Sequence, residues 1–425
     1  MAGVKANGSG LAADILGLGQ AIVDWSSSVT DGDLAQFGVA KGGRRVIGVE
    51  ERAEIMASLD EIGAQSQVSA GGSLANTLVG VARLSRAAGK NLRVALGGSL
   101  GTDTLGQFFN SQMRSAGVRC LLDHHYDLHA SSSASQQQKL PSQQQVEQQP
   151  CAPGVGSSAH TGTVMVLTTP DAQRSFLSFF TSDSLTLSER LRNAVRCSTM
   201  VVVEGYLWEM PGAEEYISAV LETASAAGVK VAMTAGDPGV VARHRDKMLR
   251  VIDRGIDMLF TNEEEAAALA GMPREGDATT VGEATLAVVD DEKGLSHGER
   301  AARALAHICP LAVVTAGSRG SYVCAMGEVH KVPAHWLPQG PVDTCGAGDA
   351  YAAGWLYAQL SGYDVRTSGE FASQVASAVI GRYGPHLSDD DAEQLVRQLP
   401  GHVSPVRVRI DLPGLGLGAG DFLDF

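Results

Sequence analysis

The sequence lacks the features that would place it in a membrane or outside the cell. No apolar run approaches the roughly 18 residues that a membrane-spanning helix needs. The opening stretch, MAGVKANGSGLA, has no long apolar segment of the kind found in secretory signals. The six cysteines form no CxxC pair and no metal-ligand spacing, so we expect free thiols in a reducing compartment. These absences predict a soluble intracellular protein with no membrane partner.

Positive charge is also scarce. The 425 residues include 33 Lys and Arg against 47 Asp and Glu, a net charge of −14. Such an acidic chain is a poor candidate for binding nucleic acid or anionic lipid, so any polyanion must be met by a local site. The hydrophobic content of 44% and charged content of 19% are typical of a globular protein with a large core.

Two common nucleotide-binding signatures are missing. No GxxxxGK[ST] occurs, which excludes a P-loop enzyme. GLGQAI, at residues 17–22, follows an expected first strand, but a GxGxxG fingerprint needs glycine where Ile22 stands. The sequence therefore argues against a dinucleotide site at this turn.

What the chain does contain is a regular alternation of apolar runs and amphipathic stretches. The pattern predicts strands at residues 14–19, 93–97, 200–204, 229–234, 256–261 and 311–315, and helices at residues 73–88, 103–116, 213–227 and 263–270. Fully apolar strands such as MVVVE and LAVVT indicate a parallel sheet covered on both faces. We expect an α/β fold with a doubly wound, mostly parallel sheet.

Two regions break this rhythm. Strands follow one another without helices near residues 44–49 and again at 161–180, where Thr-Pro-Asp-Ala gives a hairpin turn. We expect a small additional β-sheet that acts as a lid, with strands within residues 20–49 and 161–180. Residues 123–159 are rich in Gln and Ser and are predicted to be a disordered insertion. Residues 404–425 are predicted to form a loosely ordered tail.

The most informative motif is GAGD, which occurs twice, at residues 346–349 and 418–421. Only the first copy precedes a helix-length apolar stretch, AYAAGWLYAQL, and a helix is needed to provide a useful dipole. The small residues Gly346, Ala347 and Gly348 let backbone N–H groups approach an anion, and Asp349 can accept a proton from a hydroxyl group. Phosphoryl transfer needs this combination. A plain glycine turn followed by an acidic first helical turn remains an open alternative.

Longer segments around these residues resemble a known family. PVDTCGAGDAYAAG is similar to the second signature of the pfkB/ribokinase family of carbohydrate and nucleoside kinases, and SAGGSLANTLVGVARL with ALGGSLGTDTLGQFF is similar to the first. The resemblance covers residues 13–400 except the insertion, as one pfkB-type kinase domain. GLGQAIVD, TTPDAQR and VVVEGYLWE further resemble plant and algal plastid pfkB-like kinases. Cys345 departs from the usual Thr.

The resemblance implies a ribokinase-like fold with a small β-sheet lid, and it implies roles for individual residues. Asp349 would be the catalytic base, with Gly346, Ala347 and Gly348 as the anion hole. Asn262 and Glu265 would lie near Mg²⁺ and the phosphates. The nucleotide would contact Thr315, Gly317, Gly320, Asp343 and Thr344. The acceptor would contact Asp24, Gly71, Gly72, Asn76 and Glu204. Arg174 is expected either to reach an anionic ligand or to be solvated.

The resemblance also implies an activity and its partners. It predicts ATP- and Mg²⁺-dependent phosphorylation of an alcohol group on an adenosine-like nucleoside or a sugar, with room for a monovalent cation. GGSLANT favours a nucleoside over the GGKGAN form of ribokinases. A hexose or ketose kinase and a pfkB-type scaffold or regulatory protein stay open, as do monomer or homodimer and cytoplasm or chloroplast stroma. Cys345 precedes a helix, so a low-pKa, redox-sensitive thiol and an inert packing residue are both considered.

Overall fold

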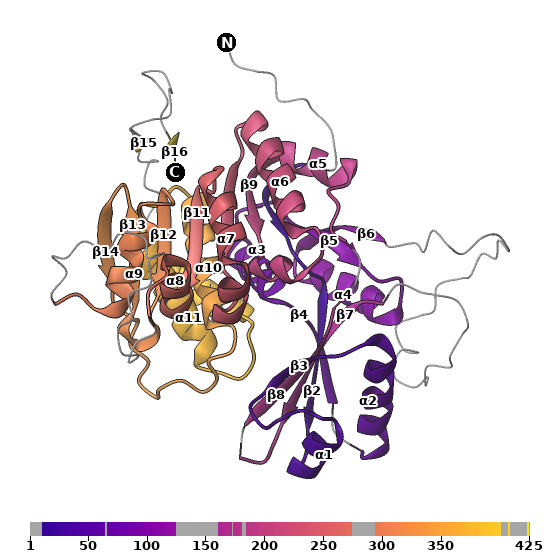
Figure 1. Ribbon diagram of the computed structural model, residues 1–425. Helices are drawn as coiled ribbons and strands as arrows, with labels where there is room; N and C mark the ends of the chain where they lie inside the picture. The colour runs from indigo at the N-terminus through magenta and orange to yellow at the C-terminus, as the bar shows by residue number, and fades with distance from the viewer. Residues whose placement is uncertain are drawn as a thin grey trace.

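The computed structural model of the chain describes residues 11–63, 66–124, 160–171, 173–180, 184–273, 294–400, 407–408 and 423–424. Within these ranges the strands form a nine-stranded sheet, a five-stranded sheet and a two-stranded ladder. The five-stranded sheet projects from the larger body and carries its own helices (Figure 1). None of the helices in the described ranges combines the length and apolar character needed to cross a bilayer.

The large sheet confirms the predicted parallel arrangement. From one edge to the other its strands are β14 (Glu328–Val332), β13 (Ser321–Ala325), β12 (Leu311–Thr315), β11 (Met258–Asn262), β10 (Lys230–Thr234), β9 (Ser198–Val203), β1 (Ala13–Leu18), β5 (Val94–Leu100) and β6 (Val118–His124). Strands β12 to β6 are parallel, whereas β13 and β14 extend the edge in antiparallel fashion.

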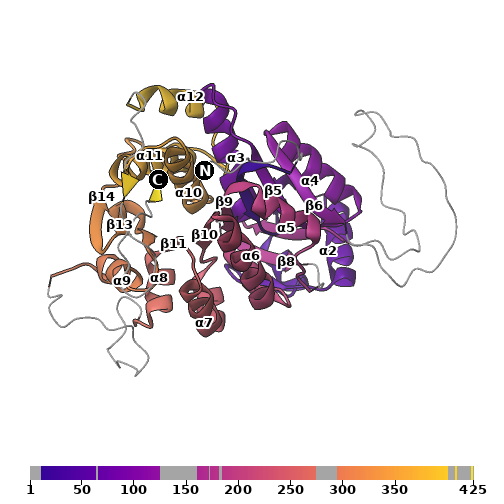
Figure 2. The same ribbon diagram turned by 90° about the horizontal axis from the view of Figure 1, so that it is seen from above.

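Helices cover both faces of this sheet (Figure 2). One face packs against α5 (Glu189–Arg196), α6 (Ala213–Ala227), α7 (Pro238–Asp253), α8 (Glu263–Ala270) and α9 (His297–Leu305). On the other side lie α3 (Ser73–Ala87), α4 (Thr104–Ser115), α10 (Ala347–Leu360), α11 (Val365–Ile380) and α12 (Asp389–Gln398). The strands are apolar along their whole length because neither face meets water; Val201, Val202 and Val203 are fully buried.

The small sheet has the order β3 (Arg44–Val46), β8 (Arg174–Phe179), β7 (Gly162–Thr168), β2 (Ile22–Ser28) and β4 (Ser66–Gly71). The predicted hairpin is present as β7 and β8, which pair in antiparallel fashion around a turn closed by the Thr169 N–H bond to the Gln173 carbonyl at 3.0 Å. Helices α1 (Asp31–Gln36) and α2 (Val49–Glu61) pack on one face through a separate apolar cluster that includes Leu34, Ile55 and Leu177. The opposite face carries no helix in the described residues.

Parts of the predicted boundaries differ from the structure. Strand β6 continues to His124, so the first two residues of the expected insertion belong to the large sheet, where they pair with β5. The rest of that insertion lies outside the described residues. Within the expected tail, Arg407–Val408 and Leu423–Asp424 pair as β15 and β16. The remainder of the tail, including the second GAGD copy, is not among the described residues.

Candidate active site

The carboxyl ends of the parallel strands converge beside the first turn of α10. The chain reverses its winding direction at β1, which lies between β5 and β9, and such a switch point opens a crevice for ligands in α/β sheets. Residues just beyond the strand ends therefore define the site. They include Gln20 after β1, Glu204 after β9, Asp237 after β10, Asn262 at the end of β11 and Gly317 after β12.

Asp349 is held in the first turn of α10 by two side chains from α3. The Ser73 hydroxyl donates to Asp349 Oδ1 at 2.6 Å, and Asn76 Nδ2 donates to Oδ2 at 3.1 Å. Thr77 Oγ1 donates to the Asp349 backbone carbonyl at 3.3 Å. The carboxylate is thus fixed in orientation by residues more than 270 positions earlier in the chain.

The environment of Asp349 suits a proton acceptor. Burial raises its pKa, while the hydrogen bonds from Ser73 and Asn76 act in the opposite direction. A carboxylate with a raised pKa is a stronger base than a solvated one, and it lies at the positive end of a helix dipole. These features are those of a proton acceptor, and the role of Asp349 as the catalytic base stays a prediction.

The two glycines before Asp349 differ in whether packing requires a residue without a side chain. Gly346 caps α10 with φ 75°, and a Cβ added there would lie 2.6 Å from Pro385 Cβ, so packing explains this glycine. A Cβ at Gly348 would meet no atom within 4 Å, so packing does not explain that one. The Ala347 N–H is directed at the Thr344 carbonyl at 3.3 Å. Open space above Gly348 leaves room for a ligand to approach the helix N-terminus.

Asp24 lies on β2, opposite Ser69 of β4. Burial raises its pKa to about 7, and the negative charge of Asp349 adds to the effect. A Cβ added to Gly71 would lie 2.0 Å from Asp24 Oδ2, so the carboxylate rests directly over this glycine. Gly72 caps α3 with φ 94°, a left-handed conformation that favours glycine. The predicted Gly-Gly pair thus makes room for Asp24 and turns the chain into α3.

Glu204 is a buried carboxylate that accepts hydrogen bonds from two neighbouring backbone segments. Its carboxylate, which is 2% exposed, accepts the Gln20 N–H at 2.7 Å and the Leu74 N–H at 3.3 Å. Burial raises its pKa to about 7; the two backbone hydrogen bonds lower it, and the charge of Asp349 raises it. These bonds tie the end of β9 to the turn after β1 and to the start of α3. The geometry indicates that Glu204 links these three segments and does not face solvent, and its contact with an acceptor stays a prediction.

The titration of Glu204 gives the first testable prediction. Between about pH 4.5 and 7 the folded protein keeps a proton that the unfolded chain releases, so this group stabilises the fold less as pH rises through that window. We expect the difference in unfolding free energy between the parent and Glu204→Gln to fall by about 2–3 kcal/mol from pH 5 to pH 8. Urea unfolding at both pH values measures it, with exposed Glu215→Gln as the control. A difference in unfolding free energy that does not change with pH would contradict the raised pKa of Glu204.

Asn262 and Glu265 form a capping box at the start of α8. Asn262 Oδ1 accepts the Glu265 N–H at 2.8 Å, and the Asn262 N–H and Nδ2 donate to the Glu265 carboxylate at 2.9 and 2.7 Å. Burial raises the Glu265 pKa to about 7, and Asp237, Glu264 and Asp349 raise it further. The two predicted metal and phosphate residues are therefore adjacent, at the carboxyl end of β11, and electrostatically coupled to Asp349.

This oxygen set can be tested against Mg²⁺. In the described residues no group of three or more His, Cys, Asp and Glu side chains could hold a metal ion. Mg²⁺ commonly keeps several waters and uses one or two protein carboxylates together with substrate phosphates. Glu265 and Asp237 fit that requirement, since the two carboxylates lie near enough for the charge of Asp237 to raise the pKa of Glu265. The site fits a metal carried in with a nucleotide rather than one caged by the protein.

The predicted nucleotide loop follows β12. Thr315 lies at the strand end, where its hydroxyl donates to the Thr261 carbonyl at 3.4 Å. Gly317 has φ 56° and nothing near its Cβ position, whereas a Cβ at Gly320 would lie 2.0 Å from the Val332 carbonyl oxygen. Gly320 is thus explained by its approach to β14, and contact of Thr315 and Gly317 with a nucleotide stays a prediction.

The surroundings of Asp343 differ from those we expected. Its carboxylate accepts two hydrogen bonds from Arg174, both at 3.1 Å, and also the N–H groups of Cys345 and Gly384 at 3.0 and 3.1 Å. Arg174 therefore contacts a carboxylate of the protein instead of standing free. The contact of Asp343 and of the exposed Thr344 with nucleotide remains a prediction.

The low-pKa thiol considered for Cys345 is wrong. Burial raises the pKa of Cys345, and the charges of Asp343, Asp349 and Asp24 raise it further, while Arg174 only partly opposes them. Burial and the nearby carboxylates therefore both oppose formation of the thiolate at this position. The alternative, an inert packing residue, stays a prediction, because Cys345 keeps exposed surface in the turn.

Sequence reasoning missed several residues of the site. Ser73, which orients Asp349, lies three residues before Asn76, and that spacing on a helix could have indicated it. Tyr206, Asp237 and Arg44 meet at the other side of the site. Arg44 Nη1 lies 3.3 Å from Asp237 Oδ2, and its guanidinium carbon lies 5.6 Å from the Tyr206 ring centre. No sequence signal links these three residues.

Solved structures of other proteins share this fold. The arrangement of sheets and helices is the ribokinase-like α/β fold, and it superposes on an adenosine kinase from Sinorhizobium meliloti with a TM-score of 0.67 and 28% identity, covering 91% of this chain and 99% of that one. An adenosine kinase from Anopheles gambiae in complex with P1,P4-di(adenosine-5) tetraphosphate gives 0.63 and 21%, covering 91% and 98%, which shows the fold alone.

The model of the pfkB family carbohydrate kinases matches residues 38–127 and 155–392. The chain belongs to the pfkB family. A nucleoside kinase from Methanothermobacter thermautotrophicus is 38% identical over 86 residues, which is 20% of this chain and 27% of the relative. A 5-dehydro-2-deoxygluconokinase from Bacillus licheniformis is 30% identical over 126 residues, 29% of this chain and 38% of the relative. Both matches span well under half of the relatives' length.

Proposed function

We propose that the protein transfers the γ-phosphoryl group of ATP to a hydroxyl group of a nucleoside, with Asp349 as the general base. The observation that carries this proposal is the fixed position of the Asp349 carboxylate at the N-terminus of α10, where Ser73 and Asn76 orient it. In the proposed reaction Asp349 accepts the proton of the acceptor hydroxyl, and the helix N-terminus around Gly348 stabilises the transferred phosphoryl group. Mg²⁺, held by Glu265 and Asp237 together with the phosphates, would neutralise their charge.

The open face of the small sheet supports a nucleoside acceptor. Asp24 pairs with Val164, and Val166 pairs with Phe176, so these side chains share the face that carries no helix in the described residues. Val164, Val166 and Phe176 are only partly buried, unlike Met165 and Leu177 on the helical face. An apolar platform beside a carboxylate suits a molecule with a flat base and a hydroxylated sugar.

A substrate panel tests the proposal. Purified protein with ATP and Mg²⁺ is incubated with adenosine and other nucleosides, and with hexoses, ketoses and sugar acids, and phosphorylated products are identified by mass spectrometry. We expect a nucleoside monophosphate as the preferred product. Faster turnover of a sugar or sugar acid would assign the site to the carbohydrate branch, and no product from any acceptor would favour a scaffold or regulatory role.

Gly348→Ala tests the anion-binding role of the helix N-terminus. Because a Cβ there meets no atom within 4 Å, we expect the melting temperature to be unchanged. Turnover should fall at least ~10-fold, since the methyl group occupies the space through which an anion approaches the backbone donors. Gly32→Ala, in the first turn of α1 and outside the site, is a control for the substitution, because a Cβ there has only an ordinary contact at 3.5 Å with Thr30 Oγ1. Unchanged kcat in Gly348→Ala would exclude this approach.

A further inference from the structure

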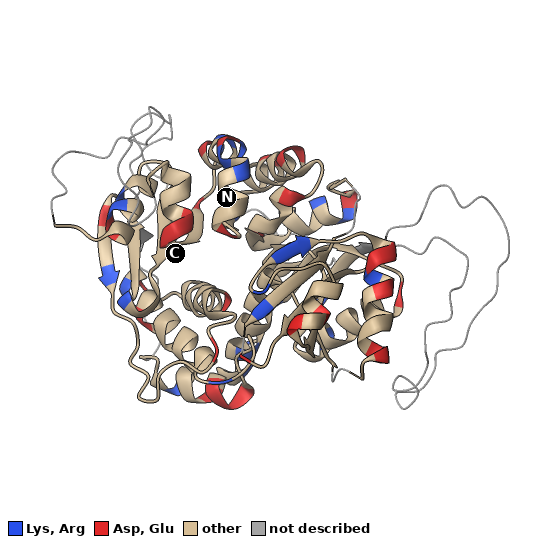
Figure 3. Ribbon diagram, turned by 60° about the horizontal axis from the view of Figure 1, so that its bottom comes forward, with Lys and Arg blue, Asp and Glu red and all other residues tan. Residues whose placement is uncertain are grey.

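Two arginine–aspartate pairs join the small sheet to the larger body. Arg44 of β3 reaches Asp237, the cap of α7, and Arg174 of β8 reaches Asp343, which precedes α10. Basic residues occur on strands of the small sheet, and acidic residues occur on elements of the larger body around it (Figure 3). The pairs contact different elements of the body, so they can be separated experimentally.

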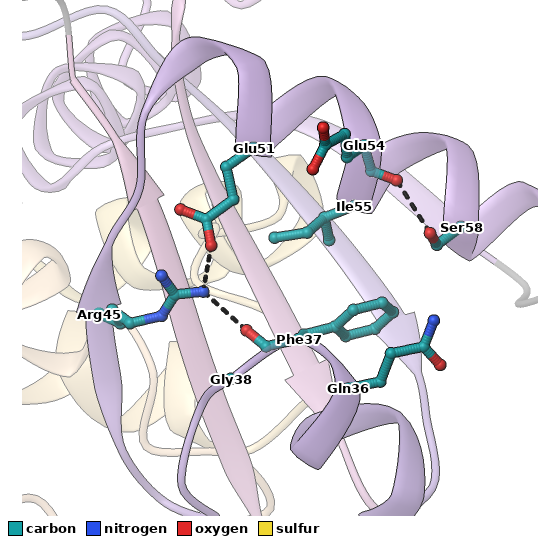
Figure 4. Close-up of a pocket in the computed structure, with 8 residues that line it drawn as sticks. All are labelled: Gln36, Phe37, Gly38, Arg45, Glu51, Glu54, Ile55 and Ser58. Atoms are coloured by element: carbon teal, nitrogen blue, oxygen red, sulfur yellow. Dashed lines mark hydrogen bonds and ion pairs between the residues drawn. The ribbon is translucent and has the colours of Figure 1, made fainter.

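The alternation of side chains along a strand explains why Arg44 reaches the larger body and its neighbour Arg45 does not. Arg44 pairs with Phe176 and therefore lies on the open face of the small sheet. The next residue, Arg45, lies on the opposite face, where it donates to Glu51 Oε1 at 2.6 Å and to the Phe37 carbonyl at 2.7 Å (Figure 4). Arg45, Glu51 and Phe37 are among the residues that line a pocket of about 390 Å³ between α1 and α2. Arg45 thus holds the small sheet to its own helices, whereas Arg44 and Arg174 hold it to the body.

The Arg174 pair differs from the Arg44 pair in what its aspartate does. Asp343, with a side chain only 6% exposed, also accepts the Cys345 N–H and the Gly384 N–H. The Cys345 bond fixes the turn that leads into Gly346, and the Gly384 bond secures this turn to the segment whose Pro385 packs against Gly346. One carboxylate therefore organises the backbone immediately before the anion-binding end of α10.

The pKa of Asp343 also depends on its contact with Arg174. Burial alone would raise the pKa of Asp343, but the hydrogen bonds from Arg174, Cys345 and Gly384 outweigh it and lower the pKa. Without Arg174 the Asp343 carboxylate would be a nearly buried negative charge with no positive partner. Removing one member of an enclosed ion pair is costly, so the turn would have to rearrange or admit water.

We propose that Arg174 is a positioning residue, which acts through Asp343 to set the geometry of residues 343–348 when the small sheet lies against the body. A movement of the small sheet away from the body would then also change the conformation of the anion-binding turn. This inference goes beyond the proposed function; its catalytic consequence rests on that function, but its structural consequence does not. Arg44 holds the same sheet without touching the turn.

Hydrogen exchange of the ligand-free protein tests the coupling, with Arg44→Gln as a matched control for Arg174→Gln. In Arg174→Gln we expect peptides covering residues 343–347 and 381–385 to exchange about tenfold faster or more, from the loss of charge-assisted hydrogen bonds. In Arg44→Gln these peptides should keep the parent rate, although exchange near the start of α7 increases. Arg174→Lys keeps the charge but not the two-pronged geometry, so it should be intermediate.

Kinetics provide the second readout. Arg174→Gln should lower kcat about tenfold or more because the phosphoryl-binding turn is misplaced. Arg44→Gln removes the partner of Asp237, which is proposed to hold Mg²⁺, so its main effect should be on the KM for Mg²⁺ and ATP. Parent-like exchange of residues 343–347 in both Arg174 variants, or an equal increase in Arg44→Gln, would overturn the proposal. If the parent phosphorylates no acceptor, the proposed function fails while the exchange comparison still decides the coupling.

Discussion

Replacing Asp349 with Asn should lower kcat at least ~10²-fold and leave ATP binding close to that of the parent. The amide cannot accept the proton of the acceptor hydroxyl, and general-base catalysis is worth about this factor. The fold should persist, because an Asn oxygen can still accept the Ser73 hydroxyl, although Asn76 Nδ2 then faces a second amide. Single-turnover kinetics measure the chemical step, and calorimetry measures the nucleotide affinity.

Ser73→Ala is the matched control for Asp349→Asn. It removes one of the hydrogen bonds that orient the carboxylate but leaves the base itself, so kcat should fall far less than in Asp349→Asn. Asp349→Asn with most of its kcat intact would remove Asp349 from the chemistry. Equal losses in both variants would mean that the effect arises from local structure.

Asp24→Asn should lower kcat/KM for the acceptor about 10²-fold, mainly through KM. A carboxylate accepts hydrogen bonds from hydroxyl groups more strongly than an amide does, by about 1.5–3 kcal/mol for each charged bond. Because the Asp24 pKa is raised to about 7, its charged form appears only as pH rises through that value. The acceptor KM of the parent should therefore fall from pH 6 to pH 8, and that of Asp24→Asn should not.

Two further variants sharpen this test. Gly71→Ala places a methyl group 2.0 Å from Asp24 Oδ2, so it should displace the carboxylate and raise KM without removing the charge. Asp60→Asn, on the exposed end of α2, makes the same chemical change away from the site and should leave KM unchanged. A parent KM that does not change with pH, together with a parent-like KM in Asp24→Asn, would exclude Asp24 from acceptor binding.

The large sheet could be read from the sequence because its strands are continuous apolar runs. The residues predicted for α6, α8 and β12 are those observed. Helix α7 was missed because its basic stretch, ARHRDK, hides the apolar face that buries Val241, Met248 and Val251. Strand β4 was missed because SQVSAG is polar and weakly patterned, and only its pairing with β2 makes it a strand.

The candidate site was predictable where a motif carries its own chemistry. GAGD before an apolar helix indicated Asp349, and GGSLAN indicated Asn76, although its contact with Asp349 joins residues 273 positions apart. Contacts that depend on sheet register were beyond the sequence. Arg44 and Arg174 reach the body only because β3 and β8 present one face to it. The raised pKa of Cys345 comes from burial and from carboxylates that the fold brings to it, including Asp24 of β2.

Transfer of labelled phosphate is the most direct test of the central claim. The parent and Asp349→Asn are incubated with Mg²⁺, adenosine and ATP carrying ¹⁸O in the γ-phosphoryl group, and both products are measured by mass spectrometry. We predict that the parent forms labelled nucleoside monophosphate and ADP in equal amounts, and that the variant forms at least ~10²-fold less of both. ADP release without a labelled acceptor, or equal transfer by the variant, would contradict this account.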